Sequence, residues 1–587
     1  MTGIPAGGAV GGGVTTTRHF VTTESGRQVH YRRAGRGPAV VLCHESPLSS
    51  VSLTDLVAWL SRRFTVIALD NPGYGSSDKL DHPDPLIGDY AEALAETLDA
   101  LGLWRVQLYG AHTGAFIALE FAIRHPQRCA GLITDGLPVF DPDDTVELLG
   151  NYLPPWEPQW DGSHLTWAWT RYSDQQVFWP WFRKERAARL DMDMPSAAWL
   201  HEGVLDLLRA GDDFRIAYQA AFRYHSFATV ERLVVPTRIT AREDDLNHPD
   251  LARLPDPLPA GVSKHALPRE RAAWAHELLR LYLELPPGDL AAPAPPPERR
   301  PAGAITRDYV DTPYGQLLAR RLGPGGGGAA AGDGDTSSRP LLMLHASPGS
   351  AKQLEPLQRA LAASGRQTIA LDTLGNGDSD KPGWRAPRLE DYARVVGSAL
   401  DALGLAEVDV YGTHTGAMIG LELALQQPGR VRGLVLDGIT MFDEAETARI
   451  LASYTPPLEP RWDGGHLLWA WTFLKDQMQF WPWFDRGNPS PWRNGELSAA
   501  QLNEWLVELL KSGESYPKGY RAAFSYPTRE KLPQLAVPTL VCSHPGDPLA
   551  PFCEEAAHLS PRVTAQLLPH DTAGQAAALA AFLAATG

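Results

Sequence analysis

The chain has 587 residues, of which 44% are hydrophobic and 21% are charged. It is too apolar to be disordered throughout, and it has no uninterrupted apolar run of the about 18 residues that indicate a membrane-spanning helix. The formal net charge of −16 predicts no general attraction to nucleic acid or to anionic membrane surfaces. A single hydrophobic core rarely grows beyond about 250–300 residues, so the length indicates more than one domain.

The four cysteines have no CxxC spacing and are too few for a disulfide framework in a chain of this size. A reducing, cytoplasmic location is therefore expected. The N-terminal segment has no apolar signal core, so residues 1–17 are expected to form a flexible tail.

A long repeat organises the rest of the chain. DALGLWRVQLYGAHTGAFIALEFA starts at Asp99, and DALGLAEVDVYGTHTGAMIGLELA starts 302 residues later, at Asp401. The same spacing relates FWPWF at 178–182 to FWPWF at 480–484. Solenoid repeats have periods of about 20–50 residues, so this period indicates two copies of a whole domain.

The expected first domain covers residues 18–284 and the second covers 305–587. Between them, residues 285–304 are rich in proline and are expected to form an extended linker. Residues 324–338 are rich in glycine and are expected to form a surface loop. A fused pair of this kind could imitate a two-fold homodimer, so an intramolecular pseudo-dimer is expected, and homo-oligomers remain an alternative.

In the first copy, short β-branched segments end in turn residues and alternate with helical segments such as 90–101. The predicted strands are 40–43, 66–70, 106–110 and 131–136. Near-continuous apolar strands with crossover helices favour a parallel sheet that is covered on both faces.

About a hundred residues rich in tryptophan and proline then interrupt this pattern in each copy, at 137–230 and 439–532. They are expected to be helical. The sheet is expected to resume with PTRITA at 236–241 and with PTLVCS at 538–543.

A strand that ends in Gly-x-Xaa-x-Gly and runs into a helix is the pattern of a nucleophile elbow, which holds its central side chain out at the top of a sheet. The two copies read Gly110-Ala111-His112-Thr113-Gly114 and Gly412-Thr413-His414-Thr415-Gly416. In both copies an apolar strand precedes the motif and an alanine-rich helix follows it.

With these motifs, nearly all of both copies resembles the α/β-hydrolase superfamily, in the capped branch that includes epoxide hydrolases and haloalkane dehalogenases. His44-Glu45-Ser46-Pro47 and His345-Ala346-Ser347-Pro348 are similar to the family's His-Gly-x-Pro oxyanion loop. The tryptophan-rich inserts stand where the family carries its cap. The resemblance implies two tandem α/β-hydrolase domains, each a mostly parallel, doubly wound sheet with a helical cap. The family has Ser, Asp or Cys at the elbow, and both copies here have His.

The resemblance also implies positions for the other catalytic residues. The family's acid falls on Asp245 in the first copy and on Asp547 in the second. The triad histidine falls on His570 in the second copy, where the first copy has Arg269. Arginine stays protonated and cannot act as a base, so an ion pair with Asp245 is expected for Arg269. The second domain is therefore expected to be the active one and the first to be degenerate.

Several roles are open for the elbow histidine. The simplest is that the histidine is catalytically inert, since His is among the non-glycine residues enriched at positive φ. As a nucleophile, His414 would form a labile acyl-imidazole with His570 as base. As a general base, it would act on water or on a substrate proton. Metal binding by His414, Asp547 and His570 is the weakest alternative, because the acid of this fold normally orients the late histidine.

The resemblance implies an oxyanion hole formed by the backbone N–H groups of Thr415 and Ser347, with Thr113 and Ser46 as their equivalents in the first copy. The inserts are expected to contribute an apolar, aromatic-lined pocket, although most of their aromatic residues are expected to be core. Expected pocket residues of the second domain are His345, His466, Trp469, Asp476 and Trp481. Histidine and aspartate of the insert could instead cap helices.

Together these features predict a cofactor-free hydrolase of an ester, thioester or amide of a small apolar molecule. A lyase or isomerase that transfers protons through the histidines is an alternative, and a non-catalytic small-molecule binding protein is another. No phosphate-binding loop, dinucleotide fingerprint or metal cluster is evident, so no cofactor and no metal is expected. The expected partner is a small-molecule substrate, with no nucleic acid and no membrane.

Overall fold

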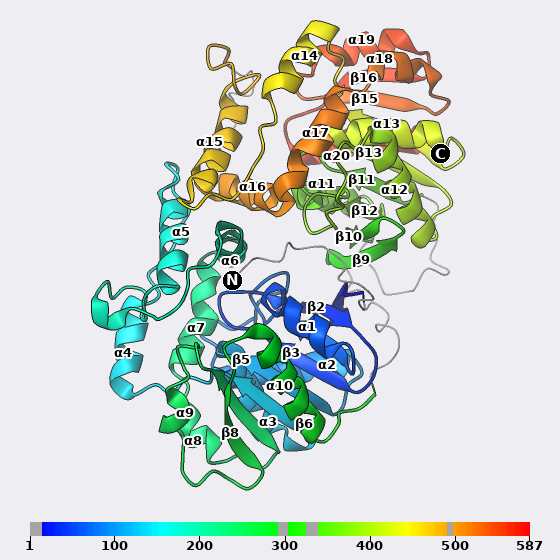
Figure 1. Cartoon of the computed structure of the whole chain (residues 1–587). Coiled ribbons are helices and arrows are strands. Elements are labelled where there is room, and N and C mark those ends of the chain that lie inside the picture. Colours follow the sequence, from blue (N-terminus) through cyan, green and yellow to red (C-terminus); the bar gives the residue numbers. More distant parts are fainter. Residues whose placement is uncertain (1–14, 291–302, 324–338, 490–496, 587) are drawn as a thin grey trace. The chain divides into compact units, whose positions relative to one another are not determined.

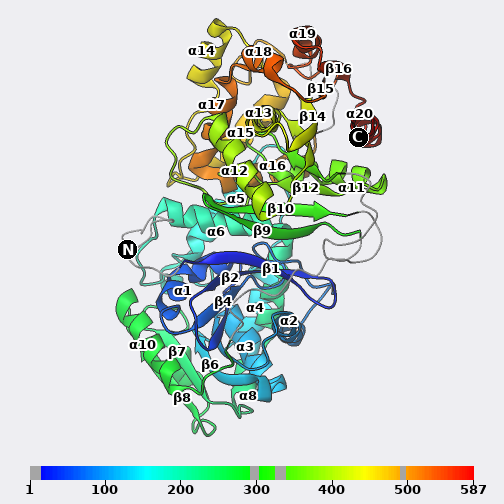
Figure 2. The same ribbon diagram turned by 90° about the vertical axis from the view of Figure 1, so that its right-hand side faces the viewer.

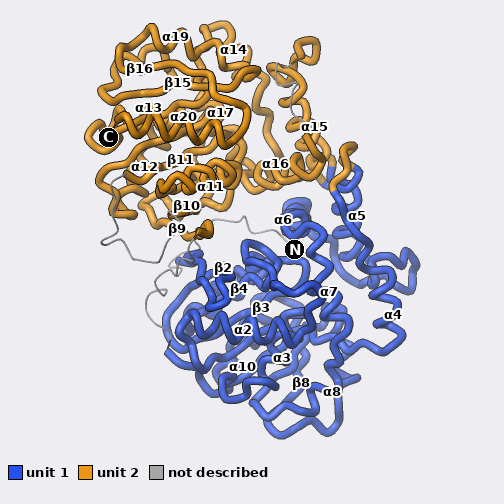
Figure 3. The backbone as a smooth tube through the Cα atoms, turned by 180° about the vertical axis from the view of Figure 1, so that it is seen from behind, with its two compact units in different colours: residues 1–157, 163–299, 462–464 blue, residues 158–162, 300–461, 465–587 orange. Residues whose placement is uncertain are grey.

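The computed structural model describes residues 15–290, 303–323, 339–489 and 497–586 (Figure 1). Most of the predicted tail, most of the predicted linker and the whole of the predicted glycine-rich loop lie outside these ranges. The chain divides into two compact units, coloured separately in Figure 3. Unit 1 comprises residues 1–157, 163–299 and 462–464, and unit 2 comprises residues 158–162, 300–461 and 465–587.

Unit 1 contains an eight-stranded sheet with the order β1-β2-β4-β3-β5-β6-β7-β8. The strands from β4 to β8 in this order are parallel, and β1 and β2 add an antiparallel edge. The strands are β1 Thr17–Thr22, β2 Gln28–Ala34, β3 Ala39–Cys43, β4 Thr65–Leu69, β5 Val106–Ala111, β6 Cys129–Asp135, β7 Thr237–Arg242 and β8 Val262–Leu267. The predicted parallel, doubly wound sheet is confirmed.

Unit 2 repeats this sheet, in the order β16-β15-β14-β13-β11-β12-β10-β9, again with an antiparallel pair at one edge. Its strands are β9 Thr306–Thr312, β10 Gly315–Leu322, β11 Leu341–Leu344, β12 Thr368–Leu371, β13 Val408–Thr413, β14 Val431–Asp437, β15 Thr539–Ser543 and β16 Val563–Leu567. The central strands β3 to β6 and their counterparts are almost entirely buried, which explains their continuous apolar sequences.

Helices cover both faces of each sheet. In unit 1, α1 packs beside α10 on one face and α2 beside α3 on the other, as Figure 2 shows. These helices are α1 Thr54–Leu60, α2 Ile87–Ala100, α3 Thr113–Arg124 and α10 Arg271–Glu284. Their counterparts in unit 2 are α11 Glu355–Ala363, α12 Leu389–Ala402, α13 Thr415–Gln426 and α20 Thr572–Ala585. None of the helices in the described ranges has the length and apolarity needed to cross a membrane.

Between β6 and β7, and again between β14 and β15, each unit carries a helical insert. The insert of unit 1 contains α4 Pro142–Asn151, α5 Ser163–Gln175, α6 Ala197–Ala210, α7 Phe214–Phe222 and α8 Ser226–Val230. That of unit 2 contains α14 Glu444–Ser453, α15 Gly465–Gln479, α16 Ala499–Ser512, α17 Tyr516–Phe524 and α18 Thr528–Lys531. Short helices α9 Asp250–Arg253 and α19 Pro551–Leu559 follow β7 and β15. Parallel strands end at the same edge of a sheet, where such inserts and loops form ligand sites.

Glycine is required on both sides of the turn from β5 to α3. A Cβ on Gly110 would lie 2.2 Å from the carbonyl oxygen of Gly114, and a Cβ on Gly114 would lie 2.3 Å from that of Cys43. Gly412 and Gly416 meet the same obstacles in unit 2. The strand, the turn and the helix therefore approach each other more closely than any side chain permits.

We expect Gly114→Ala to lower the free energy of unfolding by about 2–3 kcal/mol, because the obstructing atom belongs to the backbone of β3 and cannot move aside. Gly150→Ala in α4 is the matched control, since no atom lies within 4 Å of the added Cβ. It should stabilise the chain by about 0.5–1 kcal/mol through helix propensity. Urea unfolding of both variants measures the difference, and equal stability of the two would contradict this account of the turn.

Candidate active site

In each unit a histidine occupies the turn between a central strand and the following helix. His112 has φ 47° and ψ −109°, and His414 has φ 48° and ψ −112°. They are the only non-glycine residues with positive φ in the described ranges. The nearly identical backbone angles indicate that the elbow geometry is the same in both units. A strained backbone at a single position of each unit is typical of a functional site.

The elbow histidine of each unit forms a direct hydrogen bond with an aspartate. This aspartate follows β7 in unit 1 and β15 in unit 2. His112 Nε2 lies 2.9 Å from Asp245 Oδ2, and His414 Nε2 lies 3.1 Å from Asp547 Oδ2. The other carboxylate oxygen accepts a backbone N–H at 2.8 Å, from Asn247 in unit 1 and from Leu549 in unit 2. The aspartate is thus fixed by the backbone and in turn fixes the ring of the histidine.

This pairing raises the pKa of the imidazole. Burial lowers the pKa of His112, but the negative charge of Asp245, its hydrogen bond and the nearby Glu45 together raise it to about 9. The pKa of His414 is also raised, because Asp547 outweighs the effect of burial. In the opposite sense, burial raises the pKa of Asp245 and of Asp547, but the paired histidine lowers both below their ordinary value.

The second ring nitrogen faces a different environment. The side chain of His112 is 32% exposed and that of His414 is 40% exposed, whereas the side chains of Asp245 and Asp547 are 19% and 0% exposed. Within the described ranges, Nδ1 of neither histidine has a hydrogen-bond partner. Each elbow therefore offers one imidazole nitrogen to a small molecule and uses the other to contact its aspartate.

The predicted triad of His414, Asp547 and His570 is not assembled. His570 is exposed, and its ring stacks 6.4 Å from that of His544. The elbow imidazole itself reaches Asp547, so it takes the place that a separate triad histidine would fill. His544 Nε2 lies 3.8 Å from Asp437 Oδ2, so this pair of histidines belongs to the edge of the site.

The predicted ion pair of Arg269 with Asp245 is wrong as well. Arg269 Nε lies 3.8 Å from Asp244 Oδ2, and Arg242 holds Asp244 at 2.9 Å. Asp245 turns toward His112. The sequence favours unit 2 as the active one because it has His570 where unit 1 has Arg269. Neither residue belongs to a His–Asp pair, so this difference does not show which of the two pairs is active.

The proposed oxyanion loops lie against the elbows. In unit 2, a Cβ on Gly519 of α17 would lie 2.8 Å from Ser347 Oγ and 3.8 Å from Thr415 Cγ2, so these two predicted residues are brought together. In unit 1, Tyr218 of α7 donates a 2.8 Å hydrogen bond to the carbonyl oxygen of Ser46, and Thr113 opens α3. The first N–H groups of a helix have no acceptor within it, so they are free to stabilise negative charge.

His345, predicted as a pocket residue, is buried and bonded to the backbone around it. Its Nδ1 lies 2.8 Å from the carbonyl oxygen of Ala346, and its Nε2 accepts the backbone N–H of Thr373 at 3.0 Å. His44 makes the corresponding bonds with Glu45 and Asn71 in unit 1. Burial lowers the pKa of both histidines, so these neutral rings fix the shape of the oxyanion loop.

The polar residues predicted for the pocket in the insert of unit 2 are structural too. Buried His466 accepts the backbone N–H of Arg461 at 3.1 Å, and buried Asp476 pairs with Arg486 at 2.9 Å. Trp469 stacks on Phe473 with ring centroids 5.2 Å apart. Trp481 packs against Tyr454 and Phe442 at 5.8 Å and 6.4 Å. These contacts are those of a packed aromatic insert.

Sequence reasoning missed one buried carboxylate in each unit. Asp135 ends β6 and accepts hydrogen bonds from Tyr109 Oη at 2.9 Å and Trp274 Nε1 at 3.1 Å. Asp437 ends β14 and accepts one from Tyr411 Oη at 2.7 Å. Burial raises the pKa of both, and the charge of Asp245 or Asp547 adds to the rise. The repeated segments GLITDG and GLVLDG were the signal that could have revealed them.

Glu45 is the second missed residue. It stands beside the elbow only in unit 1, where its charge helps to raise the pKa of His112. Unit 2 has Ala346 at this position. The two sites therefore differ in charge although their backbones agree.

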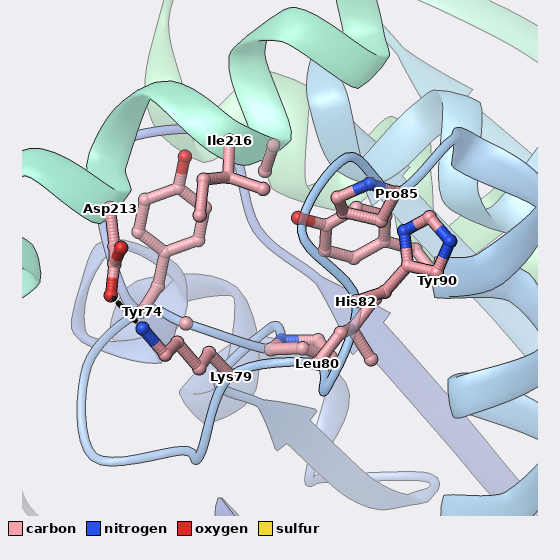
Figure 4. Close-up of a pocket in the computed structure, with 11 residues that line it drawn as sticks. Tyr74, Lys79, Leu80, His82, Pro85, Tyr90, Asp213 and Ile216 are labelled. Carbon is pink, nitrogen blue, oxygen red and sulfur yellow. Dashed lines mark hydrogen bonds and ion pairs between the residues drawn. The ribbon is translucent and has the colours of Figure 1, made fainter.

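A pocket of unit 1 lies away from the elbow, between the turn after β4 and helix α7 (Figure 4). Tyr74, Leu80, Pro85 and Tyr90 contribute to its lining, and an ion pair of 2.9 Å joins Lys79 to Asp213 at its border. Neither His112 nor Asp245 lines it. It is therefore separate from the candidate active site.

With this geometry described, the family can be stated. A family model described as the alpha/beta hydrolase fold matches residues 38–239 and 339–467, which is more than half of the chain. The chain belongs to the α/β-hydrolase fold family. The two matched segments lie in the two copies, in agreement with a tandem duplication.

Two relatives from Mycobacterium tuberculosis are similar over shorter stretches. An uncharacterized protein is 37% identical over 117 residues, which are 20% of this chain and 34% of the relative. Haloalkane dehalogenase 2 is 31% identical over 121 residues, which are 21% of this chain and 42% of the relative. The match thus covers less than half of the length of either relative.

Among solved structures, the juvenile hormone epoxide hydrolase of the silkworm Bombyx mori is 17% identical, with a TM-score of 0.37. The match covers 48% of this chain and 76% of that structure.

The raised pKa of His112 predicts a pH-dependent contribution to stability. Since the folded pKa of about 9 exceeds the ordinary 6.5, this contribution is fully present below pH 6.5 and disappears as the pH rises through 9. We expect His112→Gln to make the free energy of unfolding fall less steeply between these pH values. Denaturant titrations across this range measure the slope.

His125→Gln is the control, because His125 pairs with the exposed Glu92 on the surface and should leave the slope unchanged. A wild-type slope in His112→Gln would show that the pair with Asp245 is not an ion pair in solution.

Proposed function

We propose that the chain is a cofactor-free hydrolase of an ester, thioester or amide of a small apolar molecule, in which the elbow histidine acts as a general base on water. One observation carries this proposal. The elbow imidazole holds its aspartate through Nε2 and leaves Nδ1 without a partner among the described residues. This is the arrangement of a base with its orienting carboxylate, in a family that includes hydrolases.

The pairing favours a base over a covalent nucleophile. The nucleophile route needs a second base to release the acyl-imidazole, and His570 is exposed and stacks on His544 instead of bonding to the His414–Asp547 pair. A base with a carboxylate partner becomes more basic, as the raised pKa of both elbow histidines indicates. Water then takes the role of the missing elbow nucleophile.

The reaction proceeds in two steps. Neutral imidazole takes a proton from water at Nδ1 while the water oxygen bonds to the carbonyl carbon, and the aspartate stabilises the imidazolium. The oxyanion is stabilised by backbone N–H groups at Thr113 and Ser46 in unit 1, or at Thr415 and Ser347 in unit 2. The imidazolium then returns the proton to the leaving group as its bond to carbon breaks. Acid and alcohol, thiol or amine are the products.

Both units carry the parts that this mechanism needs. The His–Asp distances are 2.9 Å and 3.1 Å, and the elbow angles agree within a few degrees. We therefore extend the proposal to unit 1, which the sequence alone marked as degenerate.

We expect the double variant His112→Gln/His414→Gln to lose about 10²–10⁴-fold in kcat/KM on activated esters and thioesters, the range typical of a lost general base. Each single variant assigns the turnover to one unit. His125→Gln on the surface serves as the control for purification and folding. Full activity in the correctly folded double variant would exclude the elbow as the catalytic centre.

The pH profile separates base from acid. Since the neutral imidazole is the active form, kcat/KM in unit 1 should rise with pH, reach half of its maximum at about pH 9 and level off above it. It can be measured in His414→Gln, which leaves only the elbow of unit 1. A rate that falls over this range would mean that the imidazolium is the active form.

His570→Ala provides a second test of the geometry. Because His570 is exposed and stacks on His544, its removal should leave turnover unchanged. A loss as large as that of His414→Gln would restore the triad that includes His570.

A further inference from the structure

A charged residue of the unit 1 insert has no counterpart in unit 2. Arg171 on α5 is 1% exposed and is among the largest fully buried side chains of the chain. At the equivalent position, 302 residues later, unit 2 has Phe473. The guanidinium of Arg171 lies within 6 Å of four aromatic ring centroids, at 5.2 Å from Tyr152, 5.8 Å from Trp181, 5.4 Å from Phe214 and 5.7 Å from Tyr218.

This buried cation lacks an anionic partner. Within the described ranges, Nη1 donates a 2.6 Å hydrogen bond to Gln175 Oε1, the hydroxyl groups of Tyr152 and Tyr218 lie beside the guanidinium, and no carboxylate forms an ion pair with it. Nε and Nη2 are buried, and neither donates a hydrogen bond of normal geometry to any described residue. A buried charge without a partner is costly, and removing one that serves no purpose is often neutral or stabilising.

The two free donors define the shape of the missing partner. The N–H groups of Nε and Nη2 lie on one edge of the planar guanidinium and point in parallel, which matches the two oxygens of a carboxylate. The surrounding rings of Trp181 and Phe214 supply apolar contact for the body of a small molecule.

Arg171 contacts a residue that is itself hydrogen-bonded to the candidate active site. Tyr218, beneath the guanidinium, donates its hydroxyl to the carbonyl oxygen of Ser46 in the oxyanion loop. Burial raises the pKa of Tyr218, and the charge of Arg171 opposes this rise, in agreement with the 5.7 Å between the guanidinium and the Tyr218 ring. The cation therefore stands where the insert covers the carboxyl ends of β3 and β4.

We propose that unit 1 binds a small organic carboxylate, held by the Nε and Nη2 edge of Arg171 against the aromatic residues of its insert. Unit 2 should not bind it, because Phe473 fills the equivalent place by packing on Trp469 and Trp483, each at 5.2 Å. The expected stoichiometry is one carboxylate per chain. The inference concerns binding and does not depend on whether His112 acts as a base.

Isothermal titration with benzoate and phenylacetate, each compared with its uncharged amide, tests the proposal on the full chain. We expect saturable binding of one carboxylate per chain and binding of the amide weaker by at least about 30-fold, as for a lost charged hydrogen-bonded pair. Benzoate and phenylacetate that fail to bind, or that bind no better than their amides, would overturn the proposal. Inorganic phosphate that binds as tightly as the carboxylates would overturn the assignment of the ligand class.

Two variants locate the site. Arg171→Phe reproduces the residue of unit 2, and Arg171→Lys keeps the charge but removes the paired donors. Both should weaken carboxylate binding by at least about 30-fold. Arg171→Phe should not lower the melting temperature, because it removes an unpaired buried charge. Unchanged binding in either variant would overturn the role of the guanidinium edge.

Two controls complete the test. Arg183→Ala removes an arginine of the same insert that is 46% exposed and pairs with Glu147, so it should leave carboxylate binding unchanged. His112→Gln should also bind the carboxylate, which keeps this inference separate from the proposed hydrolysis. A loss of binding in Arg183→Ala equal to that in Arg171→Phe would mean that the effect is one of general charge and would contradict the site. If Arg171→Phe does not fold, the wild-type comparison of acid with amide and Arg171→Lys still decide the outcome.

Discussion

The hydrogen bond between the elbow histidine and the aspartate that follows β7 or β15 determines how each unit can act. It joins two chain segments 133 residues apart, and it exists only because the elbow holds the histidine at positive φ. That backbone conformation depends on flanking glycines whose added Cβ atoms would overlap the neighbouring strand or helix. The chemistry at Nδ1 thus rests on close backbone packing at the carboxyl edge of the sheet.

Placing histidine at the elbow changes the role of the aspartate. In a three-residue arrangement the acid orients a separate histidine, which activates the nucleophile. Here the imidazole begins at the elbow and already reaches Asp245 or Asp547, so a further histidine has no place between them. His570 and Arg269 are consequently found at the border of the site with other partners. The basic centre therefore consists of only two residues, and the nucleophile must come from outside the protein.

The two units share their backbones and differ in charge. Their elbow angles are almost the same, and both oxyanion loops are fixed by a buried neutral histidine. Unit 1 adds Glu45 and Arg171, where unit 2 has Ala346 and Phe473. Duplication has therefore kept the elbow and changed the surroundings, which is the way in which one fold acquires different ligands.

The sequence by itself determined the duplication, the parallel sheets and the elbow, because these depend on local patterns. Apolar strands, crossover helices and paired glycines can be recognised within short segments of the sequence. The 302-residue period shows that they occur twice. It also identified Asp245 and Asp547 as members of the site.

Only the tertiary structure decided which groups meet. His570 and Asp547 are 23 residues apart and do not pair, whereas His414 and Asp547 are 133 residues apart and do. The burial of Arg171 without an anion was equally hidden, since its neighbours come from the residue after α4, from α7 and from the segment after α5. Side-chain direction and burial depend on long-range packing, which a pattern along the chain does not encode.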